Sequence, residues 1–222
     1  MILSIDIGNT NITLSMINKD LEVIKSSRII TKVSRTSHDF EVILEEFLGV
    51  EGVIISCVVP EVLSPLQSAI LHCFGKEAVV IDHTSHSGIV IKTDHPEEVG
   101  ADLIADAAAV YALYGGNTLV IDFGTATTFE YISEHGELSA CVILPGLEIS
   151  AKALSSMAAM LPDIELKFPE SILATETITC MQAGIMYGYV GQVEYIIQQF
   201  AKELNCDDLK VALVDLFVVR VI

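Results

Sequence analysis

The chain has 222 residues, an apolar fraction of 51% and a mean hydropathy of +0.55, which exclude a disordered chain and allow one large or two small domains. Twelve basic residues against thirty acidic ones give a formal net charge of −18, so we expect no attraction to nucleic acid or to an anionic membrane surface. No apolar stretch reaches the ~18 residues that span a bilayer, and the amino terminus has no signal-peptide pattern. We therefore expect a cytoplasmic protein.

Apolar periodicity predicts the elements of the first half of the chain. Alternating apolar residues favour strands, and apolar residues spaced three and four apart favour helices. We expect a hairpin over 2–17, strands over 21–30, 53–59 and 78–81, and helices over 36–48 and 61–74. The polar segment 84–96, rich in His and Ser, follows as either a connector or a substrate-side loop.

The second half repeats the order of a hairpin followed by helices. We expect helices over 97–114 and 177–204, a helix that follows the break at Pro145-Gly146 and runs to about residue 160, and strands over 118–123, 128–132 and 138–144. A proline-containing loop is expected over 161–169. This repetition predicts an α/β protein of two similar domains, residues 1–95 and 96–222, each with a mixed β-sheet flanked by helices.

One short phrase, Asp-x-Gly, occurs in both halves. Residues 5–10 read Ile-Asp-Ile-Gly-Asn-Thr and residues 121–126 read Ile-Asp-Phe-Gly-Thr-Ala, each between two strand-like runs. Glycine lets a ligand approach the backbone, and the neighbouring amides, hydroxyls and carboxylate suit a phosphate and its cation. A single copy is equally typical of a plain hairpin turn. Two copies in matching context favour nucleotide binding.

A further acidic motif opens the Ala-rich helical segment. Asp102 follows Gly100 and Ala101, and Asp106 lies four residues later, so both carboxylates share one helix face. Such a pair can act as a general base toward a hydroxyl. In the alternative interpretation, Asp102 only stabilises the start of the helix. Asp106 is then a solvated surface charge, and for Asp106 this alternative is the favoured interpretation.

The cysteines are odd in number and show no C-x-x-C spacing. We expect reduced, mostly buried side chains rather than disulfides or a metal site. They are Cys57, Cys73, Cys141, Cys180 and Cys206.

Taken together, the motifs closely resemble those of the type III pantothenate kinases, which belong to the acetate kinase/sugar kinase/Hsp70/actin fold group. The resemblance covers about residues 1–211, in the family's order and spacing. The motifs are Asp6-Ile-Gly-Asn-Thr10, Pro96-Glu-Glu-Val-Gly-Ala-Asp102, Asp122-Phe-Gly-Thr-Ala-Thr-Thr128, Leu144-Pro-Gly146, Thr177 and Met181-Gln-Ala-Gly-Ile185.

This resemblance implies two ribonuclease H-like, actin-like ATPase domains. It implies transfer of the ATP γ-phosphate to the primary hydroxyl of pantothenate, giving 4′-phosphopantothenate in the first step of coenzyme A biosynthesis. Members of the family are homodimers, so the resemblance also implies a homodimer.

Roles for individual residues follow from the same resemblance. Asp102 matches the proton acceptor, Asp122 matches the ligand of a monovalent cation (K⁺ or NH₄⁺), and Asp6 would help to hold Mg²⁺. The implied ATP-binding residues are Asp6, Ile7, Gly8, Asn9, Thr10, Asn11, Ile12, Thr13 and Thr125. The implied pantothenate-binding residues are Gly100, Ala101, Asp102, Leu103 and Thr177.

The substrate motif departs from the family pattern at two positions. Leu103 stands where the family usually has an arginine that pairs with the pantothenate carboxylate, and loss of such a bond costs roughly 1.5–3 kcal/mol. Thr93 stands about where an aromatic residue is common. Lys92, His95 or His86 would be the replacement cation, unless all three are simply exposed loop residues.

The end of the chain also differs from the family. Members continue after the strand at 210–211 with a Gly-Gly loop near the nucleotide, whereas residues 212–222 read as an apolar, strand-like end. A frameshifted or truncated gene, or a genuinely divergent tail, would read this way. Two alternatives to an active pantothenate kinase therefore stay open: a non-catalytic descendant that keeps the dimeric fold, and a kinase of another small hydroxylated substrate.

Overall fold

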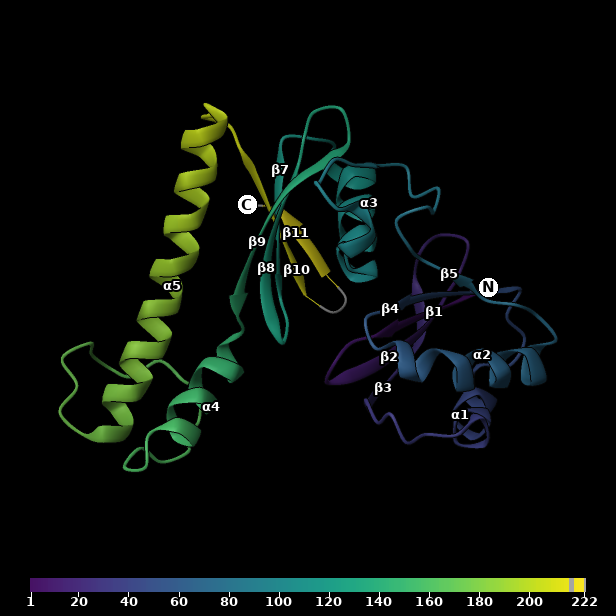
Figure 1. Cartoon of the computed structure of the whole chain (residues 1–222), viewed down its shortest axis with the longest axis horizontal. Coiled ribbons are helices and arrows are strands. Elements are labelled where there is room, and N and C mark those ends of the chain that lie inside the picture. Colours follow the sequence, from purple (N-terminus) through teal and green to yellow (C-terminus); the bar gives the residue numbers. More distant parts are fainter. Residues whose placement is uncertain (216–217, 222) are drawn as a thin grey trace. The chain divides into compact units, whose positions relative to one another are not determined.

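The computed structural model describes residues 1–215 and 218–221, with side chains for 1–214 (Figure 1). The chain divides into two compact units, Met1–Ala108 and Ala109–Ile222. This division falls inside helix α3 (Ala101–Tyr114), later in the chain than the predicted domain boundary between 95 and 96, which stays a prediction.

The first unit contains a mixed sheet in the strand order β3-β2-β1-β4-β5. Strand β1 runs antiparallel to β2 and parallel to β4, and β2 runs antiparallel to β3. The strands are β1 (Ile2–Ile7), β2 (Asn11–Ile17), β3 (Val23–Ile30), β4 (Gly52–Cys57) and β5 (Val79–Val80).

Two helices of the first unit, α1 (Ser37–Leu44) and α2 (Pro60–Phe74), cover one face of this sheet (Figure 1). Thr36 and Asp39 form a capping box at the start of α1. A one-turn 3₁₀ helix, η1 (Glu45–Phe47), completes the predicted 36–48 segment.

The helix-covered face determines which residues of the sheet are buried. Ile5 and Ile7 of β1 pack in one apolar cluster with Phe40 of α1 and Leu66 of α2, and all four are fully buried. Because side chains alternate along a strand, Asp6 points to the opposite face of the sheet. The first Asp-x-Gly motif therefore has its isoleucines in the core and its carboxylate outside it.

The approach to α3 differs from the predicted helix over 97–114. A 3₁₀ helix, η2 (Pro96–Glu98), comes first, and α3 begins only at Ala101 because Val99 is extended. The predicted connector over 84–96 also contains a short strand, β6 (Val90–Ile91).

In the second unit, strands β11, β10, β7, β8 and β9 lie side by side in that order. Strand β7 runs antiparallel to β8 and parallel to β10, so this sheet is mixed as well and the predicted α/β architecture is confirmed. Part of the predicted strand-like end is confirmed by β10 and β11, but residues 216, 217 and 222 lie outside the described residues. The strands are β7 (Thr118–Phe123), β8 (Ala126–Ile132), β9 (Glu137–Pro145), β10 (Lys210–Asp215) and β11 (Val218–Val221).

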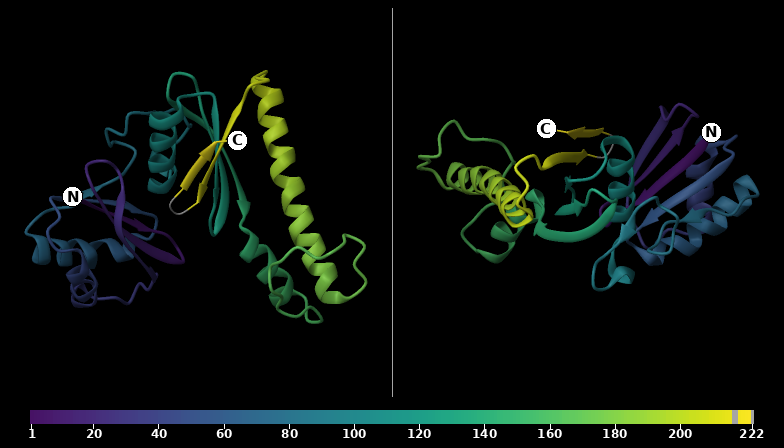
Figure 2. Two further views of the ribbon diagram at one scale, coloured as in Figure 1. Left: turned by 180° about the vertical axis from the view of Figure 1, so that it is seen from behind. Right: turned by 90° about the horizontal axis from the view of Figure 1, so that it is seen from above.

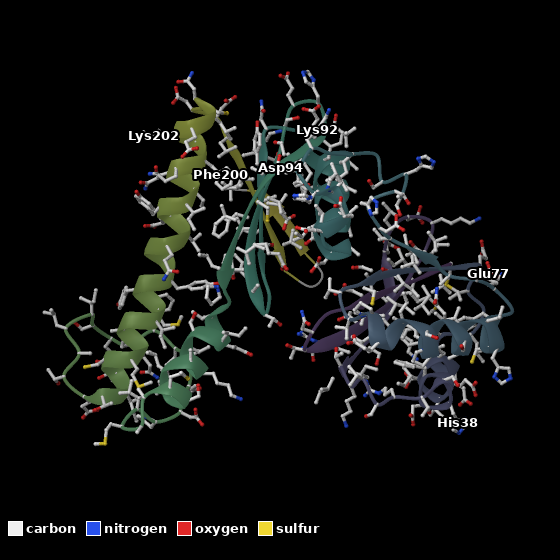
Figure 3. All side chains as sticks on the ribbon, viewed as in Figure 1. His38, Glu77, Lys92, Asp94, Phe200 and Lys202 are labelled. Atoms are coloured by element: carbon white, nitrogen blue, oxygen red, sulfur yellow. The ribbon has the colours of Figure 1, made fainter. Side chains whose placement is uncertain are left out.

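Two helices follow β9, namely α4 (Leu147–Met157) and the long α5 (Thr177–Leu204). Helix α5 lies beside the second sheet (Figure 2, left), and apolar residues of its C-terminal half pack against the core around Leu119 and Phe129. Phe200 points from α5 toward the sheet, whereas Lys202 points away from it (Figure 3).

The five cysteines are free, as predicted, but the expectation that most are buried is wrong. Cys57, Cys73 and Cys206 are half-buried, while Cys141 and Cys180 are exposed. Cys141 occupies one of the outward positions of β9, where alternate residues face solvent.

Candidate functional site

The first Asp-x-Gly loop is a hairpin turn between β1 and β2. Ile7 pairs with Ile12, so Gly8 to Asn11 form the turn, and the Gly8 N–H donates to the Asn11 carbonyl at 2.9 Å. Asn9 and Thr10 are exposed at its tip. The turn thus presents small polar side chains to solvent, which suit phosphate oxygens.

Thr31, which the sequence reading did not single out, fixes this loop from the next segment. Its hydroxyl donates to the Gly8 carbonyl at 2.6 Å, and its backbone N–H donates to the Thr10 carbonyl at 2.9 Å. Both carbonyls are thereby turned toward Thr31. A threonine directly after an edge strand gives no sequence signal for such a contact.

Asp6 and Asp102 lie within electrostatic reach of each other in the first unit. Burial raises the pKa of the Asp6 carboxyl, the neighbouring Ser56 hydroxyl lowers it in part, and the charge of Asp102 raises it further. Asp6 still has access to solvent. Two neighbouring carboxylates, one of them accessible, suit a divalent cation such as Mg²⁺.

Gly100 leaves the room that the Asp102 carboxylate needs. A Cβ at Gly100 would overlap Asp102 Oδ1 and would lie 3.7 Å from Val58 Cγ1. Asp102 Oδ1 also accepts a hydrogen bond from the Leu103 N–H at 2.9 Å, which fixes the carboxylate at the start of α3. The ends of β1 and β4 and the start of α3 therefore converge in the first unit.

The second Asp-x-Gly loop has the same plan but is one residue shorter. Phe123 pairs with Thr127, and the Gly124 N–H donates to the Ala126 carbonyl at 3.0 Å. A Cβ at Gly124 would lie 3.3 Å from Asp122 Oδ2, so glycine again accommodates a carboxylate. In both hairpins the aspartate is paired with a threonine of the next strand, Asp122 with Thr128 and Asp6 with Thr13.

Gly146 supports this second loop from the start of α4. Its N–H donates to the Thr125 carbonyl at 3.0 Å, and a Cβ here would overlap the carbonyl oxygens of Gly124 and Thr125. The Leu-Pro-Gly motif therefore has a structural reason: only glycine allows the α4 start to lie against the loop backbone.

The threonines that follow Gly124 face different surroundings. Thr125 is exposed in the loop, where a nucleotide could reach it. Thr127 is fully buried and shares a hydrogen bond with the Tyr189 hydroxyl of α5. Thr128 is buried and donates to Glu130 Oε1 at 2.7 Å. Only the first of the three is placed to contact a ligand directly.

The motif at the start of α5 combines an exposed residue and a buried one. Thr177 is exposed in the first turn. Gln182 is 2% exposed, and its side-chain amide donates to the Glu165 carbonyl at 2.7 Å, which holds the preceding loop against α5. A shallow groove of about 460 Å³ lies beside this turn, lined by Ile172, Ala174, Cys180, Ala183, Gly184, Tyr187 and Gly188.

The candidate replacement cations are exposed loop residues. Lys92 and His86 are exposed, and His95 Nδ1 lies 3.5 Å from Glu97 Oε1. Asp106 is half-buried and still partly exposed, so the helix face that it shares with Asp102 is partly covered, and its role stays open.

Among the residues whose side chains are described, 1–214, no three His, Cys, Asp or Glu side chains gather as a ready-made metal cluster. No helix among these residues has the length and apolar character needed to cross a membrane.

Comparison with known proteins agrees with these motifs. Residues 2–199 match the family model of the type III pantothenate kinases. A type III pantothenate kinase of Agathobacter rectalis is 43% identical over 219 residues, covering 95% of this chain and 84% of its own. One from Bifidobacterium longum is 41% identical over 219 residues, covering 95% and 85%. A solved Baf family protein from Campylobacter jejuni shares the fold, with a TM-score of 0.54 and 19% identity over 86% of this chain and 77% of its own.

Proposed function

Because this chain belongs to the type III pantothenate kinase family and phosphorylates pantothenate with ATP in coenzyme A biosynthesis, we propose that Asp102, Asp6 and Asp122 carry its chemistry. The observation that supports this assignment most directly is the convergence of Asp6 and Asp102, with Gly100 leaving space for the second carboxylate.

Asp102 is proposed as the general base. Its Oδ1 is held by the Leu103 N–H at 2.9 Å, which leaves Oδ2 to accept the proton of the pantothenate hydroxyl. The hydroxyl oxygen then bonds to the γ-phosphorus as the bond from that phosphorus to the bridging oxygen breaks and ADP leaves. General-base assistance of this kind contributes typically about 10²–10⁴ in rate. Charge neutralisation and positioning supply the rest of the acceleration in phosphoryl transfer.

Asp6 and the first loop are proposed to hold ATP. The backbone from Asp6 to Thr13 would cradle the phosphates, with Asp6 as a ligand of Mg²⁺. Thr125, exposed in the second Asp-x-Gly loop, is proposed as a further ATP-binding residue. When bound, Mg²⁺ would neutralise charge on the transferring phosphate. The fit rests on donor chemistry, since accessible carboxylates and loop amides are what Mg²⁺ and phosphate each prefer.

Asp122 is proposed as the ligand of a monovalent cation, K⁺ or NH₄⁺. Its carboxylate is half-buried beside Gly124, at the point where β7 turns into the second loop. A chain with a formal charge of −18 has little basic side-chain charge to offer a triphosphate, which favours a role for bound cations.

Pantothenate is proposed to contact Gly100, Ala101, Asp102 and Leu103, together with Thr177 of α5. Ala101 is 7% exposed, so it would contribute its backbone rather than its side chain. Leu103 is half-buried and offers no charge to the substrate carboxylate, so weaker pantothenate binding than in relatives with arginine is expected.

A cytoplasmic homodimer is proposed as the working form. Support comes from apolar side chains left exposed beside the α5 groove, including Phe168 (56%) and Ile172 (63%). Phe168 packs edge-on against Tyr187 with ring centroids 5.6 Å apart. Exposed apolar surface of this kind often marks a protein–protein contact.

The decisive experiment is to follow ADP release by the purified protein with ATP, Mg²⁺, K⁺ and pantothenate. ADP that forms only with pantothenate, and that Asp102→Asn abolishes, is the expected result. Retained ligand binding without turnover would instead favour the non-catalytic descendant, and turnover with a different alcohol alone would favour another substrate.

A further inference from the structure

Ser56 is a buried polar residue that the roles proposed above do not use. The side chain is 8% exposed, and its hydroxyl oxygen has no hydrogen-bond partner among the described residues. Native proteins leave few buried hydroxyls unsatisfied, because each one lowers stability. The Asp6 carboxylate is a polar neighbour of this hydroxyl, and a partner with good hydrogen-bond geometry is to be sought beyond the described residues.

The position of Ser56 in the sheet places it beside the Asp6 carboxylate. Ser56 lies near the carboxyl end of β4, directly beside Asp6 in the parallel register of β1 and β4. Its neighbour Ile55 belongs to the core under α1 and α2, so Ser56 points to the opposite face of the sheet, as Asp6 does. The Ser56 oxygen is near enough to influence the Asp6 carboxyl without making a hydrogen bond of ordinary geometry.

We propose that Ser56 is a positioning residue for the divalent cation that Asp6 holds, with its hydroxyl accepting a hydrogen bond from a cation-bound water. Mg²⁺ keeps several waters when it binds through one or two carboxylates, and each of those waters needs an acceptor. A neutral hydroxyl provides one without adding a third negative charge beside Asp6 and Asp102. The inference rests on the proposed role of Asp6.

Ser56→Ala is the direct test, and Ser15→Ala is a matched control on the same sheet. Ser15 is also 8% exposed, but its hydroxyl shares a hydrogen bond with that of Ser26 at 3.2 Å. Three quantities are measured: the Tm of the ligand-free protein, the calorimetric affinity for ADP with and without Mg²⁺, and the Mg²⁺ concentration that gives half-maximal activity.

For Ser56→Ala we expect stability and function to change in opposite directions. Removing an unsatisfied hydroxyl should leave the Tm unchanged or raise it by about 2–4 °C, while the Mg²⁺-dependent part of ADP affinity falls about tenfold. The KM for pantothenate should not change. Ser56→Thr, which keeps the hydroxyl, should restore the affinity, and Ser15→Ala should lower the Tm slightly without changing the Mg²⁺ dependence.

Two results would overturn the proposal. An unchanged Mg²⁺ dependence in Ser56→Ala, with a Tm loss like that of Ser15→Ala, would show a structural role. A raised KM for pantothenate at unchanged Mg²⁺ dependence would show that the hydroxyl contacts the alcohol instead. If the wild-type protein binds ADP with Mg²⁺ but forms no ADP from ATP in the presence of pantothenate, the proposed function fails. The role of Ser56 is then still tested by the Mg²⁺ dependence of ADP binding.

Discussion

Gly146→Ala tests the second Asp-x-Gly loop, because at this position a steric effect of the added methyl group can be separated from an effect of backbone angles. Gly146 has φ −63° and ψ 166°, angles that alanine adopts without strain. It also precedes α4 as its N-cap, and its carbonyl accepts a hydrogen bond from the Ser150 N–H at 2.9 Å. Any effect of the substitution must therefore come from the added methyl group.

The magnitude follows from what that methyl group would meet. Its carbon would overlap the carbonyl oxygens of Gly124 and Thr125 and lie 2.9 Å from the Thr125 carbonyl carbon, whereas ordinary contact begins at 3.4 Å. All three are backbone atoms, so relief requires the loop itself to move. Overpacking of this kind costs about 1–3 kcal/mol, and each kcal/mol lowers Tm by about 2–4 °C in a chain of this size.

The assay combines thermal unfolding with steady-state kinetics. We expect Gly146→Ala to lower Tm by about 2–12 °C and to raise the KM for ATP about tenfold to a hundredfold, since a small displacement of a binding loop is costly. Gly191→Ala in α5 is the control, because a Cβ there meets nothing within 4 Å. That change should raise the stability by about 0.5–1 kcal/mol through helix propensity alone.

The reasoning would be refuted if both alanine variants had the wild-type KM for ATP and the same Tm. It would also fail if Gly146→Ala lost stability while its KM for ATP stayed at the wild-type value, because the loop would then have no part in nucleotide binding.

Three further predictions concern the first unit. In ligand-free protein, Asp6→Asn should raise stability by less than about 1 kcal/mol at neutral pH, because solvent screens this accessible group, and should abolish turnover. The pKa of Asp6 is raised by burial and by the charge of Asp102, so the wild-type protein loses stability as pH rises from the unfolded-state pKa through the folded-state pKa. The stability advantage of Asp6→Asn over the wild type, measured by urea titration, should therefore grow from about pH 4 to neutral pH. Thr31→Val removes the 2.6 Å hydrogen bond to the Gly8 carbonyl, so stability should fall by about 1 kcal/mol and the KM for ATP should rise several-fold. Leu103→Arg introduces the charge that the family usually places there, so the KM for pantothenate should fall about tenfold or more while that for ATP stays constant.

Each of these predictions has a contradicting result. A pH-independent stability difference between Asp6→Asn and wild type would mean that Asp6 carries no burial penalty. An unchanged KM for ATP in Thr31→Val would remove Thr31 from the nucleotide loop. A Leu103→Arg variant with an unchanged or raised KM for pantothenate would show that this side chain does not face the substrate carboxylate.

Local pattern was enough to predict most of the secondary structure and the fold class. Strand alternation and helical spacing are encoded within a few residues, and for this reason the two hairpins and α1, α2 and α5 lie close to their predicted ranges. The start of α3 was predicted too early because Pro96 favours a helix start locally, yet Val99 is extended and the chain re-enters a helix only at Ala101.

Contacts between segments that are distant in the chain could not be predicted from the sequence. The Thr31 hydroxyl donates to the Gly8 carbonyl, and the Gly146 N–H donates to the Thr125 carbonyl. Neither a threonine nor a glycine in the sequence indicates which distant residue it will contact. Thr125, Thr127 and Thr128 read alike along the chain, but the placement of α5 buries Thr127 against Tyr189 and leaves Thr125 exposed.

The sequence by itself determined the family, the repeated Asp-x-Gly loops and the acidic residues on which the proposed chemistry depends, because these are statements about residue identity and spacing. Only the tertiary structure decided which side of each strand in the first sheet faces a ligand. Alternating side chains define two faces of the sheet, and the packing of α1 and α2 makes one of them the core face. That packing turns Asp6 and Ser56 to the same side, and the start of α3 with Asp102 lies near the same end of the sheet.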